Sequence, residues 1–241
     1  SALPFLSEAE RDRLKPRVIR PGFPRTGPDI MEVLSPNRRW FATFREHNLW
    51  LRSTEDGRAT PVTTDGIQDY KWEGASWSPD GSFLLTTKVD YREVHKVPVV
   101  HWLKREEEIE WLPYPMVGGA LPRTEIFVVD ILSKRLVRID TGDTTDQYVF
   151  PLGWLPDGSE LLVQKISRDF KKLEILAASP INGSSSIVLQ ETQKTFIKGI
   201  AMNPGVSELI TLLDDGKRFI WESERDGWDH LYLYSLEGQL I

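Results

Sequence analysis

The sequence contains no cysteine among its 241 residues. This absence excludes disulfide bonds, a thiolate nucleophile and zinc sites built on cysteine. No apolar run approaches the ~20 residues that a membrane-spanning helix needs, so we expect no membrane partner. The net charge is −6 and no basic stripe is present. Because phosphate binding depends on clustered Lys and Arg, we expect no nucleic-acid partner either.

The chain is also poor in patterns that carry catalysis. In α/β-hydrolases the nucleophilic serine lies in a Gly-x-Ser-x-Gly turn, and the two nearest matches, residues 74–78 and 205–209, lack the final glycine. No glycine-rich phosphate loop is present, and no two histidines have metal-binding spacing. We therefore predict no catalytic residue, no cofactor and no metal for this chain. The histidines are His47, His95, His101 and His230.

What the sequence does contain is a repeated turn. A turn signal followed by an apolar run occurs at residues 35–38, 77–81, 154–158 and 213–216. Proline fixes φ at the second turn position and glycine supplies a positive φ, so each unit predicts a strand, a tight turn and a strand. The first two turns lie 43 residues apart, from Asn37 to Asp80, which matches a four-stranded propeller blade of about 40–45 residues.

We therefore predict an all-β fold, a partial β-propeller of four-stranded antiparallel blades. Residues 1–29 are expected to form a short helix and a proline-rich crossover, and 30–241 about four blades, the last one incomplete. A solenoid or β-sandwich is the alternative, although sandwiches lack a long-period repeat. Four tryptophans are expected at similar places in the repeat, filling the space between blades. The blades are placed near 30–66, 67–147 (with an insertion from Asp90 to Pro122), 148–196 and 197–241, and the tryptophans are Trp50, Trp77, Trp154 and Trp221.

Longer stretches carry a family resemblance. Residues 89–98 and 113–120 resemble the long second-blade connection of the dipeptidyl-peptidase IV type, within the prolyl oligopeptidase family, and residues 221–234 resemble a recurring stretch of its N-terminal propeller. The resemblance runs from about residue 30 to the end. It implies an eight-bladed propeller joined to a C-terminal α/β-hydrolase domain, whose Ser-Asp-His triad removes dipeptides from peptide substrates. This chain would then be the non-catalytic segment that gates and positions those peptides.

The resemblance also points to a binding site. The family holds the substrate amine with two adjacent glutamates on a short helix before the second-blade turn, but residues 66–77 are too few for that helix and contain no Glu-Glu pair. Asp69 and Glu73 are the only acids there, and we predict them as substrate-binding residues because carboxylates accept ammonium N–H donors. The alternative is that both are solvent-exposed turn acids. This departure leaves aminopeptidase and oligopeptidase activity open for the parent protein.

Two functions and two assemblies stay open at this point. The chain is either a peptidase segment or a stand-alone propeller that binds proteins as a scaffold. Four blades of an eight-bladed ring leave open faces and strand edges, so we expect self-association through the terminal blades, which light scattering would detect. Compact closure of a four-bladed ring is the other possibility.

Overall fold

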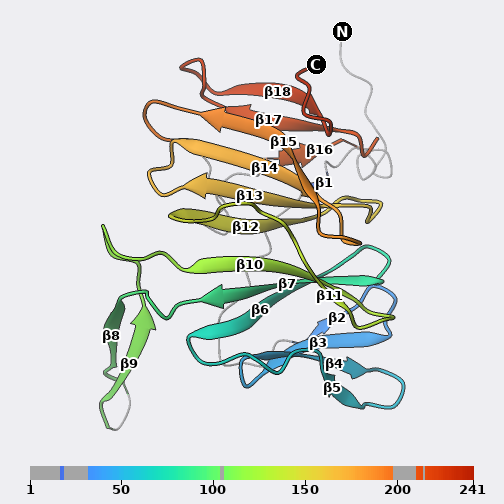
Figure 1. The fold of residues 1–241 in the computed structure, drawn as a ribbon, viewed down its shortest axis with the longest axis vertical. Helices are drawn as coiled ribbons and strands as arrows, with labels where there is room; N and C mark the ends of the chain where they lie inside the picture. Colours follow the sequence, from blue (N-terminus) through green and yellow to red (C-terminus); the bar gives the residue numbers. More distant parts are fainter. Residues whose placement is uncertain (1–16, 19–31, 104–105, 198–209, 214) are drawn as a thin grey trace, which may run out of the picture.

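The computed structural model describes residues 17–18, 32–103, 106–197, 210–213 and 215–241. In this part of the chain the regular structure is entirely β, as four four-stranded sheets and one two-stranded sheet, all with antiparallel pairing (Figure 1). The predicted all-β fold with four-stranded antiparallel units is confirmed. The predicted N-terminal helix lies outside the described residues. Those residues include no helix long and apolar enough to cross a bilayer.

The four-stranded sheets follow one another along the chain, and we number them blades 1 to 4. In blades 1 to 3 the four strands pair in chain order. Blade 1 contains β2 (Val33–Leu34), β3 (Trp40–Arg45), β4 (Asn48–Ser53) and β5 (Ala59–Pro61). Blade 2 contains β6 (Tyr70–Trp77), β7 (Phe83–Asp90), β10 (Arg123–Asp130) and β11 (Leu136–Arg138). Blade 3 contains β12 (Gln147–Trp154), β13 (Leu161–Ser167), β14 (Lys172–Ala178) and β15 (Ser185–Thr192).

Blade 4 differs from the others because one of its four strands comes from a distant part of the chain. It contains β16 (Ile210–Leu212), β17 (Arg218–Ser223) and β18 (His230–Ser235), and β1 (Arg17–Val18) pairs with the free edge of β16. A strand from the start of the chain therefore joins the last blade. The residue limits that the sequence suggested for the blades stay a prediction.

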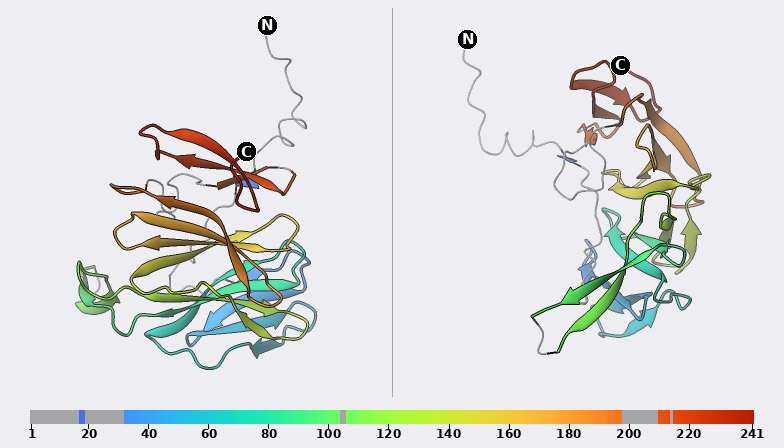
Figure 2. Two further views of the ribbon diagram at one scale, coloured as in Figure 1. Left: turned by 45° about the horizontal axis from the view of Figure 1, so that its top comes forward. Right: turned by 90° about the vertical axis from the view of Figure 1, so that its left-hand side faces the viewer.

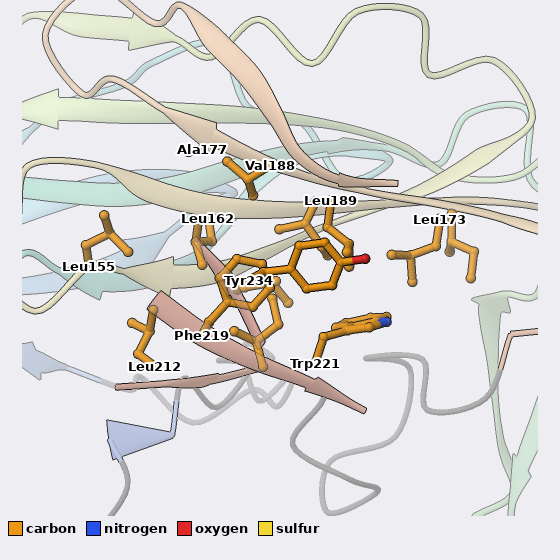
Figure 3. Packing of buried hydrophobic residues seen from close by; sticks show 14 of the residues in the cluster. Leu155, Leu162, Leu173, Ala177, Val188, Leu189, Leu212, Phe219, Trp221 and Tyr234 are labelled. Carbon is orange, nitrogen blue, oxygen red and sulfur yellow. The ribbon is translucent and has the colours of Figure 1, made fainter. Parts of the chain in front are cut away.

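The core lies between the blades: the central strands of blades 2 and 3 are buried on both faces, whereas β4 of blade 1 and β17 of blade 4 alternate between buried and partly exposed residues and bury the face that meets a neighbour. Leu51 and Leu84 belong to the cluster between blades 1 and 2, and Leu85 and Val163 to the one between blades 2 and 3. The largest cluster joins blades 3 and 4 (Figure 3). The blades form an open arc with blade 1 and blade 4 at opposite ends of the long axis (Figures 1 and 2). The described residues therefore do not form the compact four-bladed ring that was the alternative.

The tryptophans do not occupy equivalent places, contrary to the prediction. Trp77 and Trp154 end the strand that precedes the turn in blades 2 and 3, whereas Trp221 lies in the strand that follows the turn in blade 4, and Trp50 lies one strand further on in blade 1. An apolar run shows that a strand is present but not which of the four it is. The two equivalent residues share one contact, because each indole N–H donates to the first strand of the preceding blade. Trp77 Nε1 lies 2.9 Å from Val33 O, and Trp154 Nε1 lies 3.0 Å from Ser76 O.

This shared contact predicts a difference between two tryptophans. Trp154→Phe should lower the free energy of unfolding by about 1 kcal/mol, since an internal hydrogen bond contributes about that much net. Trp50→Phe is the matched control, because the buried Trp50 Nε1 has no hydrogen-bond partner, and it should cost less. Urea unfolding followed by circular dichroism measures both losses. A larger loss for Trp50→Phe would contradict the assigned contact.

The predicted insertion between β7 and β10 forms a two-stranded ribbon. β8 (Lys96–His101) and β9 (Glu108–Pro113) pair along their whole length and project from the side of blade 2 (Figures 1 and 2). We call this ribbon the arm. Its base lies beside the start of β6. Of the two acids predicted to bind substrate, Asp69 directly precedes β6 and Glu73 lies within it.

Candidate functional site

The first strand of blade 2 contains a bulge that sets the direction of its side chains. The pairing of β6 with β7 shifts between Glu73 and Ala75, and the intervening Gly74 has φ of +73°. Because side chains alternate along a strand, one extra residue restores Trp72 and Trp77 to the same face. Trp72 packs on Phe127 with ring centroids 4.8 Å apart, and Trp77 joins the core between blades 1 and 2. Glu73 is thereby left on the other face of the strand.

Glu73 lies in a polar cluster inside the strand rather than in an exposed turn. Its Oε1 accepts a hydrogen bond from the Tyr91 hydroxyl at 2.9 Å, and Lys71 Nζ lies 3.3 Å from its Oε2. That second contact is an ion pair without hydrogen-bond geometry, and Oε2 is a buried atom with no hydrogen-bond partner. The side chain is only 15% exposed, so the interpretation as a solvent-exposed turn acid is wrong for Glu73.

Asp69 precedes the strand and holds the base of the arm. Its Oδ2 pairs with Lys96 Nζ at 2.7 Å, and Lys96 is the first residue of β8. The main-chain oxygen of Asp69 accepts the N–H of Tyr91 at 2.7 Å. Each of the two predicted acids therefore faces its own lysine, and among the described contacts no hydrogen bond or ion pair joins one acid to the other.

Tyr91 is the residue that connects these two acids, and no pattern in the sequence predicts this role. Its N–H binds Asp69 and its hydroxyl binds Glu73. Burial, followed by the charge of Glu73, raises the pKa of Tyr91 well above the ordinary value. The phenol is therefore neutral and acts as a donor to the carboxylate. A tyrosine at the start of a long connection carries no pattern from which this role could be predicted.

A second polar cluster on the blade supports the strand. Lys88 is 4% exposed, and its Nζ lies 2.6 Å from Asp65 Oδ2 and 3.9 Å from the Tyr70 ring centroid. Burial alone would raise the pKa of Asp65, but hydrogen bonds from Lys88 and Trp72 outweigh it and lower the pKa. The Tyr70 hydroxyl donates to Glu125 Oε2 at 2.9 Å, and burial together with this carboxylate raises the pKa of Tyr70 to about 12. These groups satisfy one another, which indicates a structural role.

In the near-miss elbow, Ser76 stands at the position of the nucleophile and lies in β6, and Ser78 begins the blade turn that follows. Ser78 is buried; its hydroxyl donates to Asp80 Oδ1 at 2.7 Å and accepts the N–H of Phe83 at 2.9 Å. Gly81 supplies the positive φ of the turn, +73°. This hydroxyl is therefore used in holding the turn. Among the described residues no group of three His, Asp or Glu side chains could hold a metal ion.

The chain is similar to known peptidases over most of its length. Two curated relatives are the probable dipeptidyl-aminopeptidase B of Emericella nidulans and the probable dipeptidyl peptidase 4 of Aspergillus flavus. Each is 23% identical and is matched over 85% of this chain. The match covers 26% of the first relative and 29% of the second. The chain thus spans between a quarter and a third of the length of these relatives.

Solved structures agree on the fold. Porphyromonas gingivalis dipeptidyl peptidase 4 superposes with a TM-score of 0.74 at 20% identity, covering 88% of this chain and 31% of that one. A putative dipeptidyl aminopeptidase IV from Bacteroides ovatus gives 0.69 at 23% identity, covering 86% and 29%. The family model described as the dipeptidyl peptidase IV N-terminal region matches residues 11–241. By this match the chain belongs to the family of dipeptidyl peptidase IV N-terminal regions.

Proposed function

We propose that this chain is the non-catalytic propeller segment of a dipeptidyl-peptidase-type serine exopeptidase. It gates and positions peptides for a C-terminal α/β-hydrolase domain of the same parent polypeptide. Family membership supports this proposal, and so does the much greater length of the relatives. The sequence itself contains no Gly-x-Ser-x-Gly elbow, so the hydrolytic chemistry is assigned to the other domain.

The observation that carries the proposal is that the two oxygens of the Glu73 carboxylate differ in their hydrogen bonding. One oxygen is fixed by Tyr91, while Oε2 has no hydrogen bond. A carboxylate oxygen with free acceptor capacity is a suitable partner for the ammonium group of a peptide N-terminus. Asp69 is the weaker of the two candidates because its carboxylate already has Lys96 Nζ at 2.7 Å. A single carboxylate then replaces the adjacent glutamate pair that is absent from residues 66–77.

The test is Glu73→Gln in the full parent polypeptide. We expect kcat/KM for an alanyl-prolyl chromogenic substrate to fall between about tenfold and a hundredfold, because a hydrogen bond to a charged group contributes about 1.5–3 kcal/mol. The exposed acid Glu237 provides the control, since Glu237→Gln should leave kcat/KM unchanged. Asp69→Asn reports whether the second acid contributes. Wild-type kcat/KM for Glu73→Gln would refute the assigned role.

A scaffold function is the second candidate, and the coding sequence decides between the two. A Gly-x-Ser-x-Gly elbow followed by Asp and His in the parent polypeptide supports the peptidase assignment. A parent polypeptide without them would make this chain a protein-binding propeller.

A further inference from the structure

Lys71 and Glu73 lie side by side because residues two apart in a strand share a face. Besides its contact with Glu73 Oε2 at 3.3 Å, Lys71 Nζ lies 5.2 Å from the centroid of the Tyr91 ring. A carboxylate oxygen and an aromatic face within about 6 Å are two groups that together bind an ammonium ion. The ammonium of Lys71 therefore already occupies the position in which Glu73 and Tyr91 would bind an amine.

We propose that Lys71 is a built-in competitor of the substrate amine, and that a peptide N-terminus binds Glu73 only by displacing it. This inference rests on the function proposed for Glu73. The Lys71 side chain is 31% exposed and that of Glu73 is 15% exposed, so the lysine is the outer partner. Its flexible four-carbon chain lets the ammonium leave by rotation into solvent, which uncovers Oε2.

The other lysines of this region are held more firmly. Lys88 is 4% exposed and lies 2.6 Å from Asp65 Oδ2. Lys96 lies 2.7 Å from Asp69 Oδ2 in hydrogen-bond geometry. Lys71 has neither of these constraints, because its ion pair lacks hydrogen-bond geometry and the carboxylate oxygen it faces has no other partner. The site at Glu73 is therefore the one from which a lysine is most easily displaced.

Partly exposed ion pairs are weak, so the competition is modest but measurable. A ligand that binds only the displaced state loses affinity in proportion to the fraction of molecules in that state. For a pair of this exposure the loss is about fivefold at most. Removing the lysine charge should therefore raise the affinity for a charged amine ligand by the same factor. It should leave the affinity for the uncharged form of that ligand unchanged.

The experiment is calorimetric titration of the 241-residue chain with the tripeptide Ala-Pro-Ala and with its N-acetylated form. We expect Lys71→Met to bind the free-amine peptide more tightly than the wild type, by up to about fivefold. Lys71→Arg should bind like the wild type, because it keeps the charge. Lys172→Met is the matched control, since Lys172 forms a comparable ion pair with Glu174 at 2.7 Å on a different blade. Neither Lys71 variant should improve binding of the acetylated peptide.

The outcomes separate the two proposals. One outcome is that Glu73→Gln no longer binds the free-amine peptide while Lys71→Met binds it no more tightly than the wild type. In that case the competitor role of Lys71 is overturned and the role of Glu73 stands. If Glu73→Gln binds the free-amine peptide as the wild type does, both fall. Circular dichroism checks the fold of each variant, and Lys71→Gln replaces Lys71→Met if the latter unfolds.

Discussion

Replacing Trp221 by alanine should lower the free energy of unfolding by about 3–5 kcal/mol. The side chain is fully buried, at 0% exposed, in the cluster that joins blades 3 and 4 (Figure 3). Its indole Nε1 also donates to Glu191 Oε2 at 2.7 Å, from β17 of one blade to β15 of the other. The substitution removes apolar contacts, leaves a cavity and deprives a buried carboxylate of a donor, and urea unfolding measures the sum.

An exposed tryptophan of the same blade provides the control for this prediction. Trp228 is 76% exposed in the turn between β17 and β18, so Trp228→Ala should change the free energy of unfolding by less than about 0.5 kcal/mol. Trp221→Phe should fall between the two, because it keeps most of the ring while removing the hydrogen bond to Glu191. Equal losses for Trp221→Ala and Trp228→Ala would show that the interface between blades 3 and 4 does not depend on the buried ring.

The second large effect is expected at Gly183, in the turn between β14 and β15. A Cβ atom there would lie 2.1 Å from the main-chain oxygen of Arg138, the last residue of β11 in blade 2. The glycine φ is +77°, a conformation that costs other residues about 1–2 kcal/mol. Because the opposing atom is backbone, blades 2 and 3 must move apart. We expect Gly183→Ala to lower the free energy of unfolding by about 3 kcal/mol or more.

Gly216 separates the two causes of this loss. Its φ is +63°, yet nothing lies within 4 Å of the position of its Cβ atom, so Gly216→Ala retains the backbone strain without the collision. It should cost about 1 kcal/mol. Urea unfolding of both variants gives the difference. If Gly216→Ala were as damaging as Gly183→Ala, the close contact between the blades would not be the cause.

The turns and the blades could be predicted because their signals are local. Gly81 and Gly158 both have φ of +73°, as the Pro-Asp-Gly turns require, and the apolar runs after them are buried strands. The predicted equivalence of the tryptophans was wrong, although the turns in the sequence already separate two of them. Trp154 starts the turn at residues 154–158, whereas Trp221 follows the turn at residues 213–216. The pairing of β1 with β16 could not be predicted either, because a strand of two residues shows no hydrophobic periodicity.

The candidate site was predictable in part. Asp69 and Glu73 could be predicted as candidates because the segment before the second turn is short and contains only these acids, and their binding role stays a prediction. Their surroundings were not predictable. Lys96 reaches Asp69 from the arm, and Tyr91 reaches Glu73 from the end of β7, so both contacts depend on how a long insertion folds back. The bulge at Gly74, which decides the face on which Glu73 lies, leaves no distinct mark in the sequence.

The order of the strands has a consequence for the rate at which the chain folds. In blades 1 and 3 every pair of partners is adjacent along the chain, and in blade 2 only the arm intervenes. Short loops close at little entropic cost, so low contact order favours blades that form early and side by side. The pairing of Arg17 with Leu212 joins segments almost the whole chain apart. Bringing these two segments together has the largest entropic cost of loop closure. That cost is smaller when the blades between them have already folded.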